Sequence, residues 1–597
     1  MSASESHIFE FGDFRVEADK RRLLHRGEAV PLTPKVFDTL LLLLQHKGEI
    51  VEKDDLMRAI WPDTVVEENN LNQNISTLRR VLGQNQNENR CILTVPGKGY
   101  RFVADVKVSD AVQPSPATSH EQPATTTVTL AVLPFESIGA EPEREYLADG
   151  LTEETIATLG QIDPNHLSVI GRTSVMTYKR TTKSLAEIGR ELHAAYLIES
   201  SIRAEGGRLR ITSKLIRVSD QVQIWSASYD SEPSSMLAFQ RELSAAIAAQ
   251  VHLRLSPDRL SALARRHSRN AEAYDLYLRG RHFWNQLTPA ATRRAIDYFA
   301  RAAELDPNYA LAWSGLADSY SAGPINGDAP PQLVWPRARE AAANAIKAEP
   351  ELAEVQTTLG FLKFWLEWDW PGAEAAFRKG IVLDPNYSLA HRMLGIVLAH
   401  LGRQEEARPA IRRARELDPL LAVHHALSSQ VAFCGREYSE AAQFARQSIV
   451  VDPEFWVGHL QLAQALEQLG QIEPALDALS SAGRFSGGNS KVVSLRGYIF
   501  AKLGRKDEAR EVLRTLVAIA RERYVPPYAV ALVHAGLGEP DDTFEWLERS
   551  FDVHDVHLVF LPVDPKWDAL RADPRFLSLL KGCGFSTSAP PSPEKGC

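Results

Sequence analysis

The sequence predicts a multidomain chain: an α+β domain with a terminal hairpin, then a small α/β domain, then a long all-α repeat array. Three observations support this prediction. The run Asn70–Leu82 has apolar residues at helical spacing, and a hairpin-like segment follows at Arg90–Val103. Strand-like and helical runs alternate between residues 128 and 255. From Ala271 onwards, Asp-Pro pairs and small residues recur every 34 residues.

The charge of the chain is distributed unevenly. Its 597 residues carry a formal net charge of −9, which argues against a general nucleic-acid coat. Glu49–Glu68 holds seven acidic and two basic residues, whereas Asn69–Lys107 holds six basic and two acidic residues. This split indicates a small DNA-binding face on an otherwise acidic protein.

The sequence predicts a cytoplasmic protein without membrane contact. No basic start followed by an apolar run is present, and the longest apolar stretch, Leu40–Leu44, is too short to cross a bilayer. The cysteines lack metal-ligand spacing, so free thiols are expected at Cys91, Cys434, Cys583 and Cys597. The histidines His424, His425, His554 and His557 have no cysteine partners, and we expect no metal site or cofactor.

The first domain (residues 1–107) begins with four short alternating segments that read as strands, at residues 8–12, 14–18, 21–26 and 28–33. A helix is predicted from Thr33-Pro34 through Lys47, and a second helix from about Glu52 to Ile60. The third helix and the hairpin follow.

The third helix has one apolar face and one polar face. The apolar stripe consists of Leu71, Ile75, Leu78 and Leu82. The sequence predicts a polar face without a carboxylate, which consists of Asn72, Gln73, Asn74, Ser76, Thr77, Arg79 and Arg80. Amides read adenine edges, and arginine reads guanine or phosphate. A solvated surface helix is the alternative, but such helices usually mix both charge signs, which favours DNA recognition.

Three segments of this domain (residues 32–63, ISTLRRVLG and TVPGKGYRFV) resemble the winged helix-turn-helix domain of the OmpR/PhoB family. The resemblance implies that Asn72, Gln73, Asn74, Thr77 and Arg80 face the DNA groove and that Arg79 contacts phosphate. It implies backbone or minor-groove contacts for Thr94 and Lys98, with Arg101 close behind. Tyr100 either contacts DNA or packs under the wing. The loop Trp61–Glu68 matches the segment that contacts RNA polymerase in family members.

The chain also departs from the family pattern. Many members have more arginines on this helix, where this chain has Asn74, Ser76 and Thr77, so one module should bind phosphate more weakly. Because the first strand is predicted from residue 8, we expect no phospho-acceptor receiver domain before it. The arrangement is similar to the CadC/ToxR-type regulators, which span the membrane, whereas this chain has no candidate span.

Residues 108–127 read as a flexible linker, and residues 128–255 as an α/β domain that ends in three strands. AVLPF, EYLADGLTEE and IWSASYD resemble the TolB N-terminal-like or FlgO-like domain. Asp149, Glu153 and Glu154 form an acidic cluster that we interpret as capping of a helix near Glu153–Leu159. Because no phosphate-binding loop or catalytic triad is present, we expect no enzyme activity; nucleotide or ligand sensing stays open.

Residues 270–558 resemble about eight tetratricopeptide repeats, one of which is lengthened by the insert Ser321–Pro336. A capping helix is expected within residues 559–585 and a disordered tail at 586–597. The repeats predict a groove that binds a protein or peptide. Five aromatic residues either line this groove or pack between helices: Phe361, Phe364, Trp365, Trp368 and Trp370.

The sequence therefore predicts a one-component transcriptional regulator. Its partners would be double-stranded DNA, a protein or peptide in the repeat groove, RNA polymerase, and a second copy of the chain on DNA. Two rival hypotheses are a scaffold whose winged helix docks protein, and a nucleotide-sensing signalling protein.

Overall fold

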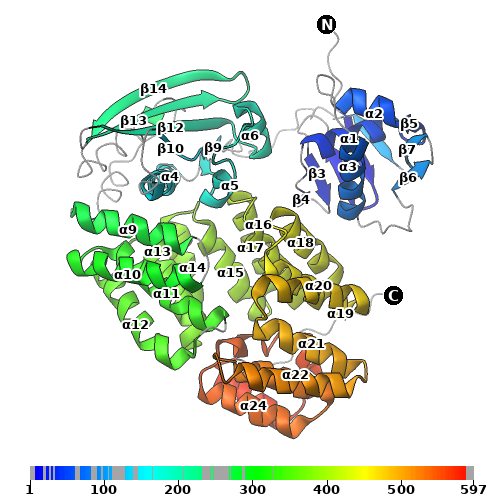
Figure 1. Ribbon diagram of the computed structural model, residues 1–597, viewed down its shortest axis with the longest axis vertical. Helices are drawn as coiled ribbons and strands as arrows, with labels where there is room; N and C mark the ends of the chain where they lie inside the picture. The colour runs from blue at the N-terminus through cyan, green and yellow to red at the C-terminus, as the bar shows by residue number, and fades with distance from the viewer. Residues whose placement is uncertain are drawn as a thin grey trace, which may run out of the picture. The chain divides into compact units, whose positions relative to one another are not determined.

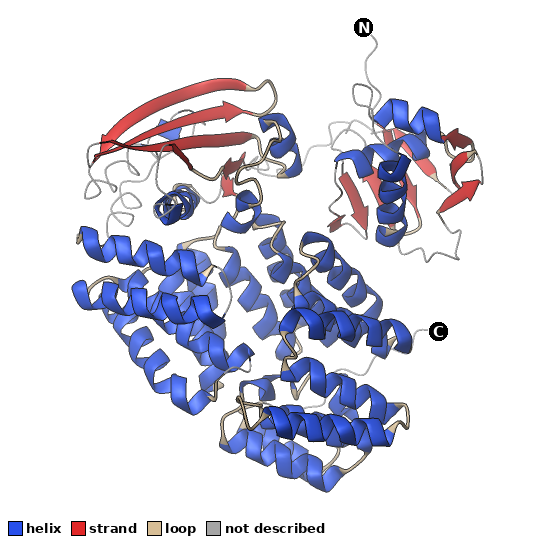
Figure 2. Cartoon of the chain, viewed as in Figure 1, coloured by secondary structure: helices blue, strands red, loops and turns tan. Residues whose placement is uncertain are grey.

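The structure is a computed structural model, and it describes residues 7–17, 22–25, 28–30, 32, 34–60, 68–82, 91–95, 98–104, 106–110, 128–138, 145–163, 166–205, 208–231, 243, 246–247, 250, 268, 270–285, 289–326 and 329–585. The chain forms two compact units, residues 1–124 and 125–597. Within the described residues, strands occur in the first unit and in the part of the second unit that precedes residue 271 (Figures 1 and 2).

The first unit opens with the predicted antiparallel strands, which are β1 (His7–Phe11), β2 (Phe14–Glu17), β3 (Arg22–His25) and β4 (Glu28–Val30). A fifth strand, β8 (Lys107–Asp110), pairs with β1 and gives the sheet order β4-β3-β2-β1-β8. The predicted linker therefore starts too early. Residues 108–110 form a strand because the backbone of β1 offers an unpaired edge.

Three helices and a second sheet complete this unit. The helices are α1 (Pro34–Gln45), α2 (Lys53–Ile60) and α3 (Glu68–Val81), close to the predicted ranges. The predicted hairpin is β6 (Ile92–Val95) with β7 (Gly99–Phe102). A short strand that we did not predict, β5 (Ile50–Glu52), pairs with β7 on the side away from β6. The helices and both sheets enclose one apolar core.

The second unit begins with a mixed sheet of strand order β11-β9-β12-β13-β14. Its strands are β9 (Val128–Val132), β10 (Glu136–Ile138), β11 (Leu167–Val169), β12 (Tyr196–Glu205), β13 (Arg208–Arg217) and β14 (Val222–Ser231). The neighbours β11, β9 and β12 are parallel, and β10 also pairs with β12 in parallel. The last three strands form the predicted antiparallel meander.

The helices of this region are α4 (Glu145–Gly160), α5 (Arg172–Met176) and α6 (Leu185–Glu191). Helix α4 begins at Glu145 rather than near Glu153, so the acidic cluster lies inside the helix and our capping interpretation is wrong. Ser184 and Glu187 form a capping box that starts α6 where the sequence predicts it.

The repeat array consists of eight consecutive helix pairs, in agreement with the predicted number. The pairs are α9 (Ala271–Trp284) with α10 (Pro289–Leu305), α11 (Ala310–Asn326) with α12 (Pro331–Ala348), α13 (Ala353–Leu362) with α14 (Trp370–Leu383), α15 (Ser388–His400) with α16 (Gln404–Leu417), α17 (Ala422–Cys434) with α18 (Tyr438–Val451), α19 (Trp456–Gln468) with α20 (Ile472–Ser486), α21 (Ser490–Lys502) with α22 (Lys506–Ile519), and α23 (Pro527–Leu537) with α24 (Pro540–Asp552). A π-helix, η3 (Lys363–Glu367), extends α13. The insert forms the adjoining ends of α11 and α12.

A recurring hydrogen bond begins the first helix of five repeats. In each, the side chain six residues after a loop proline donates to that proline's carbonyl oxygen. The pairs are Trp313 with Pro307, Gln356 with Pro350, His391 with Pro385, His425 with Pro419, and His459 with Pro453, at 2.7–2.9 Å. Because the donor nitrogen satisfies a carbonyl of the preceding loop, this bond fixes the loop against the helix.

The end of the chain departs from the predicted single capping helix. It contains two 3-10 helices, η4 (Val556–Phe560) and η5 (Pro565–Leu570), followed by α25 (Pro574–Gly582). The aromatic run packs against this region: Trp370 stacks on Phe585 and Trp368 stacks on His554. Among the described residues, no helix is long and apolar enough to cross a membrane.

Candidate nucleic-acid interface

Helix α3 is held by the predicted apolar stripe. Leu71, Ile75, Leu78 and Leu82 are buried in the core of the first unit, together with leucines of α1 and α2. Burial of one such side chain contributes about 1.5–3 kcal/mol, so the stripe fixes the rotation of the helix about its axis. The rotation in turn decides which polar residues reach solvent.

Asn74 does not lie on the solvent face, contrary to our prediction. It is 9% exposed, and its Nδ2 donates to the Oγ1 of Thr39 at 3.0 Å and to the carbonyl oxygen of Lys35 at 3.2 Å. Thr39 is itself buried and donates to the same carbonyl at 2.6 Å. The Asn74 amide therefore joins α3 to α1 instead of facing a DNA groove.

Arg79 joins α3 to the hairpin. Its Nη2 donates to the carbonyl oxygen of Ile92 at 3.1 Å and to the Oγ1 of Thr94 at 2.6 Å. We expected this guanidinium to be directed to phosphate, but in the structure it holds strand β6 beside the helix. The exposed Thr94 shares its hydroxyl with this contact.

Tyr100 packs under the hairpin, which was one of our two alternatives. The ring is 4% exposed, and its hydroxyl donates to the Oδ1 of Asn72 at 2.7 Å. Gly99 follows the turn at a point where a Cβ atom would lie 2.0 Å from the carbonyl oxygen of Val51. Only glycine allows β5 and β7 to pair here. Gly97 lies outside the described residues.

The polar groups left on the surface are exposed on α3 and on the hairpin. Asn72, Gln73 and Ser76 are exposed, and Thr77 is half-buried. Lys98 is exposed, and Arg101 is half-buried, with no partner for its Nε among the described residues. Arg80 belongs to α3, but its side chain lies outside the described residues, as does the loop 61–67. This set contains amides and hydroxyls for base edges and a cation for phosphate.

The acidic cluster of α4 is a contact between the α/β region and the first repeat. Glu153 pairs with Arg281 and accepts from Asn285 at 3.0 Å, and Arg172 lies 3.4 Å away. Burial raises the pKa of Glu153, but Arg281 and Arg172 outweigh burial and hold that pKa below its ordinary value. The carboxylate is therefore charged and satisfied, with no role in catalysis required.

Asp149 repeats this arrangement one helical turn earlier. It pairs with Lys179 and lies 3.3 Å from the Nδ1 of His282. Burial raises the pKa of Asp149, but the hydrogen bonds from His282 and Lys179 lower it by more, so the pKa lies below its ordinary value. The α/β region also contacts the fourth repeat: the backbone nitrogen of Ser174 donates to the carboxylate of the buried Asp418, the residue that follows α16, at 2.8 Å.

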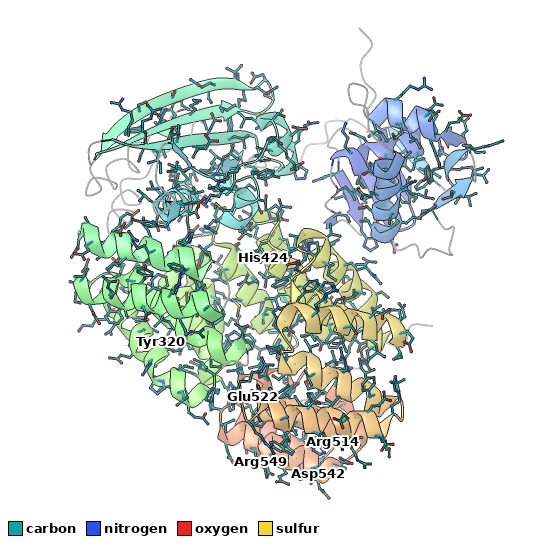
Figure 3. All side chains as sticks on the ribbon, viewed as in Figure 1. Tyr320, His424, Arg514, Glu522, Asp542 and Arg549 are labelled. Carbon is teal, nitrogen blue, oxygen red and sulfur yellow. The ribbon has the colours of Figure 1, made fainter. Side chains whose placement is uncertain are left out.

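Side chains suited to a metal meet at one place among the described residues. His534, Glu539 and Asp542 bring their ligand atoms within 4.8 Å of one another, a group that no sequence motif indicated. The Nδ1 of His534 lies 2.8 Å from the Oε2 of Glu539, so a hydrogen bond accounts for two of the three side chains. His424 (labelled in Figure 3) is fully buried, and burial lowers its pKa well below its ordinary value.

Family models match four segments of the chain. Residues 27–102 match the transcriptional regulatory protein C-terminal domain, and residues 126–246 match the second domain of HilA/YgeH-like transcriptional regulators. Tetratricopeptide repeat models match residues 369–422 and 491–523. The N-terminal unit thus contains a regulator-type winged helix, and the predicted order of domains is confirmed.

Three curated relatives show how far the similarity extends. The transcriptional regulator HilA of Salmonella typhimurium is 27% identical over 415 residues, which are 69% of this chain and 70% of HilA. Putative adenylate cyclase 3 of Rhizobium meliloti is 31% identical over 188 residues, 32% of each chain. The transcriptional activator CadC of Escherichia coli is 29% identical over 100 residues, 17% of this chain and 20% of CadC.

Proposed function

We propose that this chain reads duplex DNA with α3 and receives its signal through the second unit. Its winged helix identifies it as a DNA-binding transcriptional regulator. The observation that supports this proposal most is that α3 has no carboxylate from Leu71 to Val81 and exposes Asn72, Gln73 and Ser76, while the hairpin exposes Lys98. Such a surface combines base-edge readers with a phosphate contact.

The proposal divides the predicted site residues by role. Gln73, Ser76, Thr77 and Arg80 would contact bases in the major groove, and Lys98 would contact phosphate. Arg79, Asn72, Thr94 and Tyr100 would hold the helix and hairpin as one surface, because they bond to one another in pairs. Arg101 would support the hairpin from behind.

Selection from a random duplex library tests this proposal. The full chain should enrich one sequence motif, with an affinity that falls steeply as salt rises. Replacement of Gln73 by alanine should relax the preference at one or two positions, and replacement of Lys98 should weaken binding to every sequence. Arg514→Ala, which changes an exposed arginine of α22 (labelled in Figure 3), is the control. Absence of any enriched motif would reject the proposal.

Two copies would bind direct repeats, because a single winged helix buries little surface on DNA. The enriched motif should then contain two half-sites about one helical turn, or ~10 bp, apart. The loop 61–67, with Glu68 at the start of α3, would contact RNA polymerase from DNA-bound copies. The chain would act in the cytoplasm, where its DNA is found.

A second candidate function is nucleotide-dependent signalling, which the similarity to putative adenylate cyclase 3 favours. The acidic residues available for such chemistry in α4 are already paired with Arg281 and Lys179. We therefore propose that the chain is not an enzyme. Incubation of the full chain with ATP or GTP should give no turnover, and measurable product would support the rival. A stable protein partner without DNA affinity would instead favour the scaffold hypothesis.

A further inference from the structure

The last part of the chain, residues Val553–Phe585 (the C-terminal segment), lies on the face formed by the first helices of the repeats (the inner face). Helix η4 packs beside α11 and η3, and η5 packs beside α23. Side chains of α15, α19 and α23 also contact the segment, as described below. The groove that we predicted on this face is therefore covered at these repeats by residues of the same chain.

The segment belongs to the apolar core of the array. Six of its side chains are at most 1% exposed: Val556, Leu558, Val559, Leu561, Trp567 and Phe576. The indole of Trp567 also donates to the Tyr528 hydroxyl at 2.9 Å. Removal of the segment would return these side chains to water, and with them the apolar residues that they cover.

A buried chain of hydrogen bonds crosses the inner face beneath the segment. His400 contacts the carbonyl oxygen of Val559 through Nδ1 at 2.9 Å, and its Nε2 accepts from Gln430 at 3.3 Å. Gln430 accepts from Gln461, which accepts from Gln464, each at 3.2 Å. Gln464 accepts from Lys566 at 2.8 Å. This series of hydrogen bonds starts at Val559 and ends at Lys566, both of which belong to the segment. Because each bond joins a donor to an acceptor, the series favours one register of the segment on the inner face.

Arg436 gives independent evidence that the inner face is adapted to this segment. The turn between the paired helices has a positive φ in six successive repeats, at residues 368, 402, 436, 470, 504 and 538. Four of these residues are glycine, and the other two are Trp368 with φ 55° and Arg436 with φ 65°. A side chain in this left-handed conformation is unfavourable and often marks a function.

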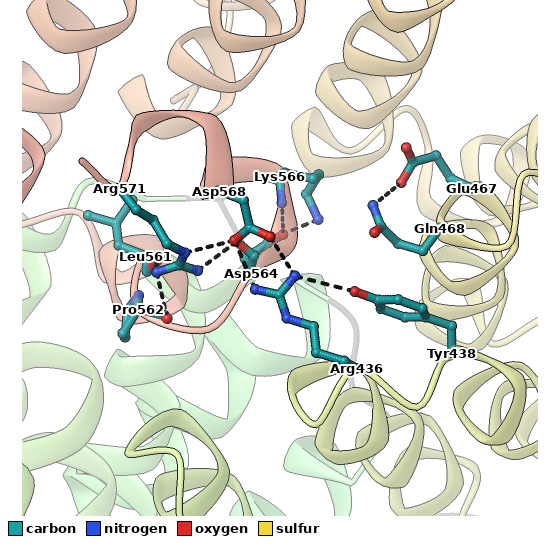
Figure 4. A network of polar contacts seen from close by, with 10 residues as sticks. All are labelled: Arg436, Tyr438, Glu467, Gln468, Leu561, Pro562, Asp564, Lys566, Asp568 and Arg571. Carbon is teal, nitrogen blue, oxygen red and sulfur yellow. Dashed lines mark hydrogen bonds and ion pairs between the residues drawn. The ribbon is translucent and has the colours of Figure 1, made fainter. Parts of the chain in front are cut away.

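The Arg436 side chain contacts the segment directly. Its guanidinium donates to both carboxylate oxygens of Asp568, at 2.6 and 2.8 Å (Figure 4). Arg571, on the segment itself, donates to the same carboxylate at 2.7 Å. A bidentate arginine–carboxylate pair is strong and directional. Arginine therefore replaces glycine in the repeat where the turn faces an aspartate of the segment.

The start of the segment is held by aromatic rings. His554 lies between Trp368, at 3.7 Å between ring centroids, and Trp335, at 4.5 Å. Trp335 belongs to the insert of the second repeat, and Trp368 follows the π-helix η3. The insert and the π-helix, which both depart from the regular repeat, thus each place a tryptophan against His554 of the segment.

We propose that the C-terminal segment is the resident ligand of the repeat array, so that the inner face binds residues 553–585 of the same chain and takes no peptide from another protein. An open solenoid has contacts between neighbouring repeats only. The segment adds contacts between repeats that are distant in sequence and makes the array a closed domain. A protein partner, if the regulator has one, docks on another surface.

Hydrogen–deuterium exchange of the full chain tests this proposal. The amides of η4 and η5 should exchange as slowly as those of α15, α17 and α19, because segment and array open together. Arg436→Gly keeps the favourable turn but removes the pair with Asp568, and it should speed exchange of η5 by about tenfold. Arg378→Ala, which removes exposed ion pairs within the array, is the control and should leave η5 unchanged.

A labelled synthetic peptide of residues 553–585, added to the full chain, gives a second readout. We expect no saturable binding, because the site is occupied. Saturable binding of the peptide, or exchange of η4 and η5 about a hundredfold faster than α17 in the unchanged chain, would overturn the proposal. DNA binding by the winged helix is a separate readout, so failure here leaves the proposed function unaffected.

Discussion

The amide of Asn74 donates a 3.0 Å hydrogen bond to the hydroxyl of Thr39, and this bond lies inside the protein rather than at its surface. Asn74 has the chemistry of a base reader and the position of a residue that joins two helices. Its neighbours Gln73 and Ser76 remain exposed on α3. Within one turn of α3, one polar residue therefore stabilises the fold while its neighbours remain available to contact DNA.

Replacement of Asn74 by alanine should destabilise the first unit by about 1–3 kcal/mol, because the hydroxyl of Thr39 and the carbonyl of Lys35 lose a buried donor. Urea unfolding of residues 1–124, the compact first unit, measures this loss. Ser76→Ala, an exposed change on the same helix, should alter stability by less than about 0.5 kcal/mol. If Asn74→Ala keeps the stability and changes the preferred DNA sequence, its assignment as a joining residue fails.

Arg79→Ala should weaken binding to all DNA sequences by loosening the hairpin. Because its Nη2 and Nε already donate to Ile92 and Thr94, the number of phosphate contacts should change little. The slope of log affinity against log salt should then stay nearly constant, whereas Lys98→Ala should reduce it by about 0.9. Equal losses of slope in the two variants would show that Arg79 contacts phosphate directly.

The sequence was sufficient for features that recur or that lie close together in the chain. The stripe Leu71, Ile75 and Leu78 and the 34-residue repeat period both correspond to the observed elements. Asn74 was misassigned although the signal was present: it lies three residues after Leu71 and four before Leu78, which places it on the apolar side of a helix.

Other features had no local signal. Glu153 and Arg281 are separated by 128 residues, and only the fold brings them together. The same holds for Arg436 and Asp568, which are 132 residues apart. The repeat period did predict helix pairs, but it could not predict that a non-repeating segment covers their inner face. Such a segment is specified by side-chain complementarity, which one sequence does not reveal.

Replacement of Glu153 by alanine should lower the stability of the second unit, because the half-buried Arg281 and Arg172 would lose their carboxylate. Removal of one partner of a fully buried ion pair typically costs about 3–5 kcal/mol, which is the upper bound for this half-buried site. Glu145→Gln is the matched control: this carboxylate also pairs with Lys179 and Arg180, but it is partly exposed, and its loss should cost less than about 1 kcal/mol. Thermal unfolding of the full chain distinguishes the two; equal shifts would contradict the importance of the α4–α9 contact.

The stability of the second unit should fall as the pH drops from about 6.5 towards 4. Burial lowers the pKa of His400 to about 4, although its bond to the Val559 carbonyl partly opposes this shift. Above about pH 6.5 the imidazole is neutral in both states, and its contribution is fully present. Between the two pKa values the unfolded chain binds a proton and the folded chain does not, so stability is lost as pH falls.

Protonation would also place an N–H group of His400 against the donating amide of Gln430, which breaks the hydrogen-bond chain to Lys566. Urea unfolding of the full chain at several pH values should therefore show a smaller pH dependence in His400→Gln than in the unchanged chain. The largest difference expected from this one group is about 3 kcal/mol near pH 4. His46→Gln, at an exposed position of the first unit, serves as the control. An unchanged pH dependence in His400→Gln would mean that this histidine titrates normally and that the buried chain is not maintained in solution.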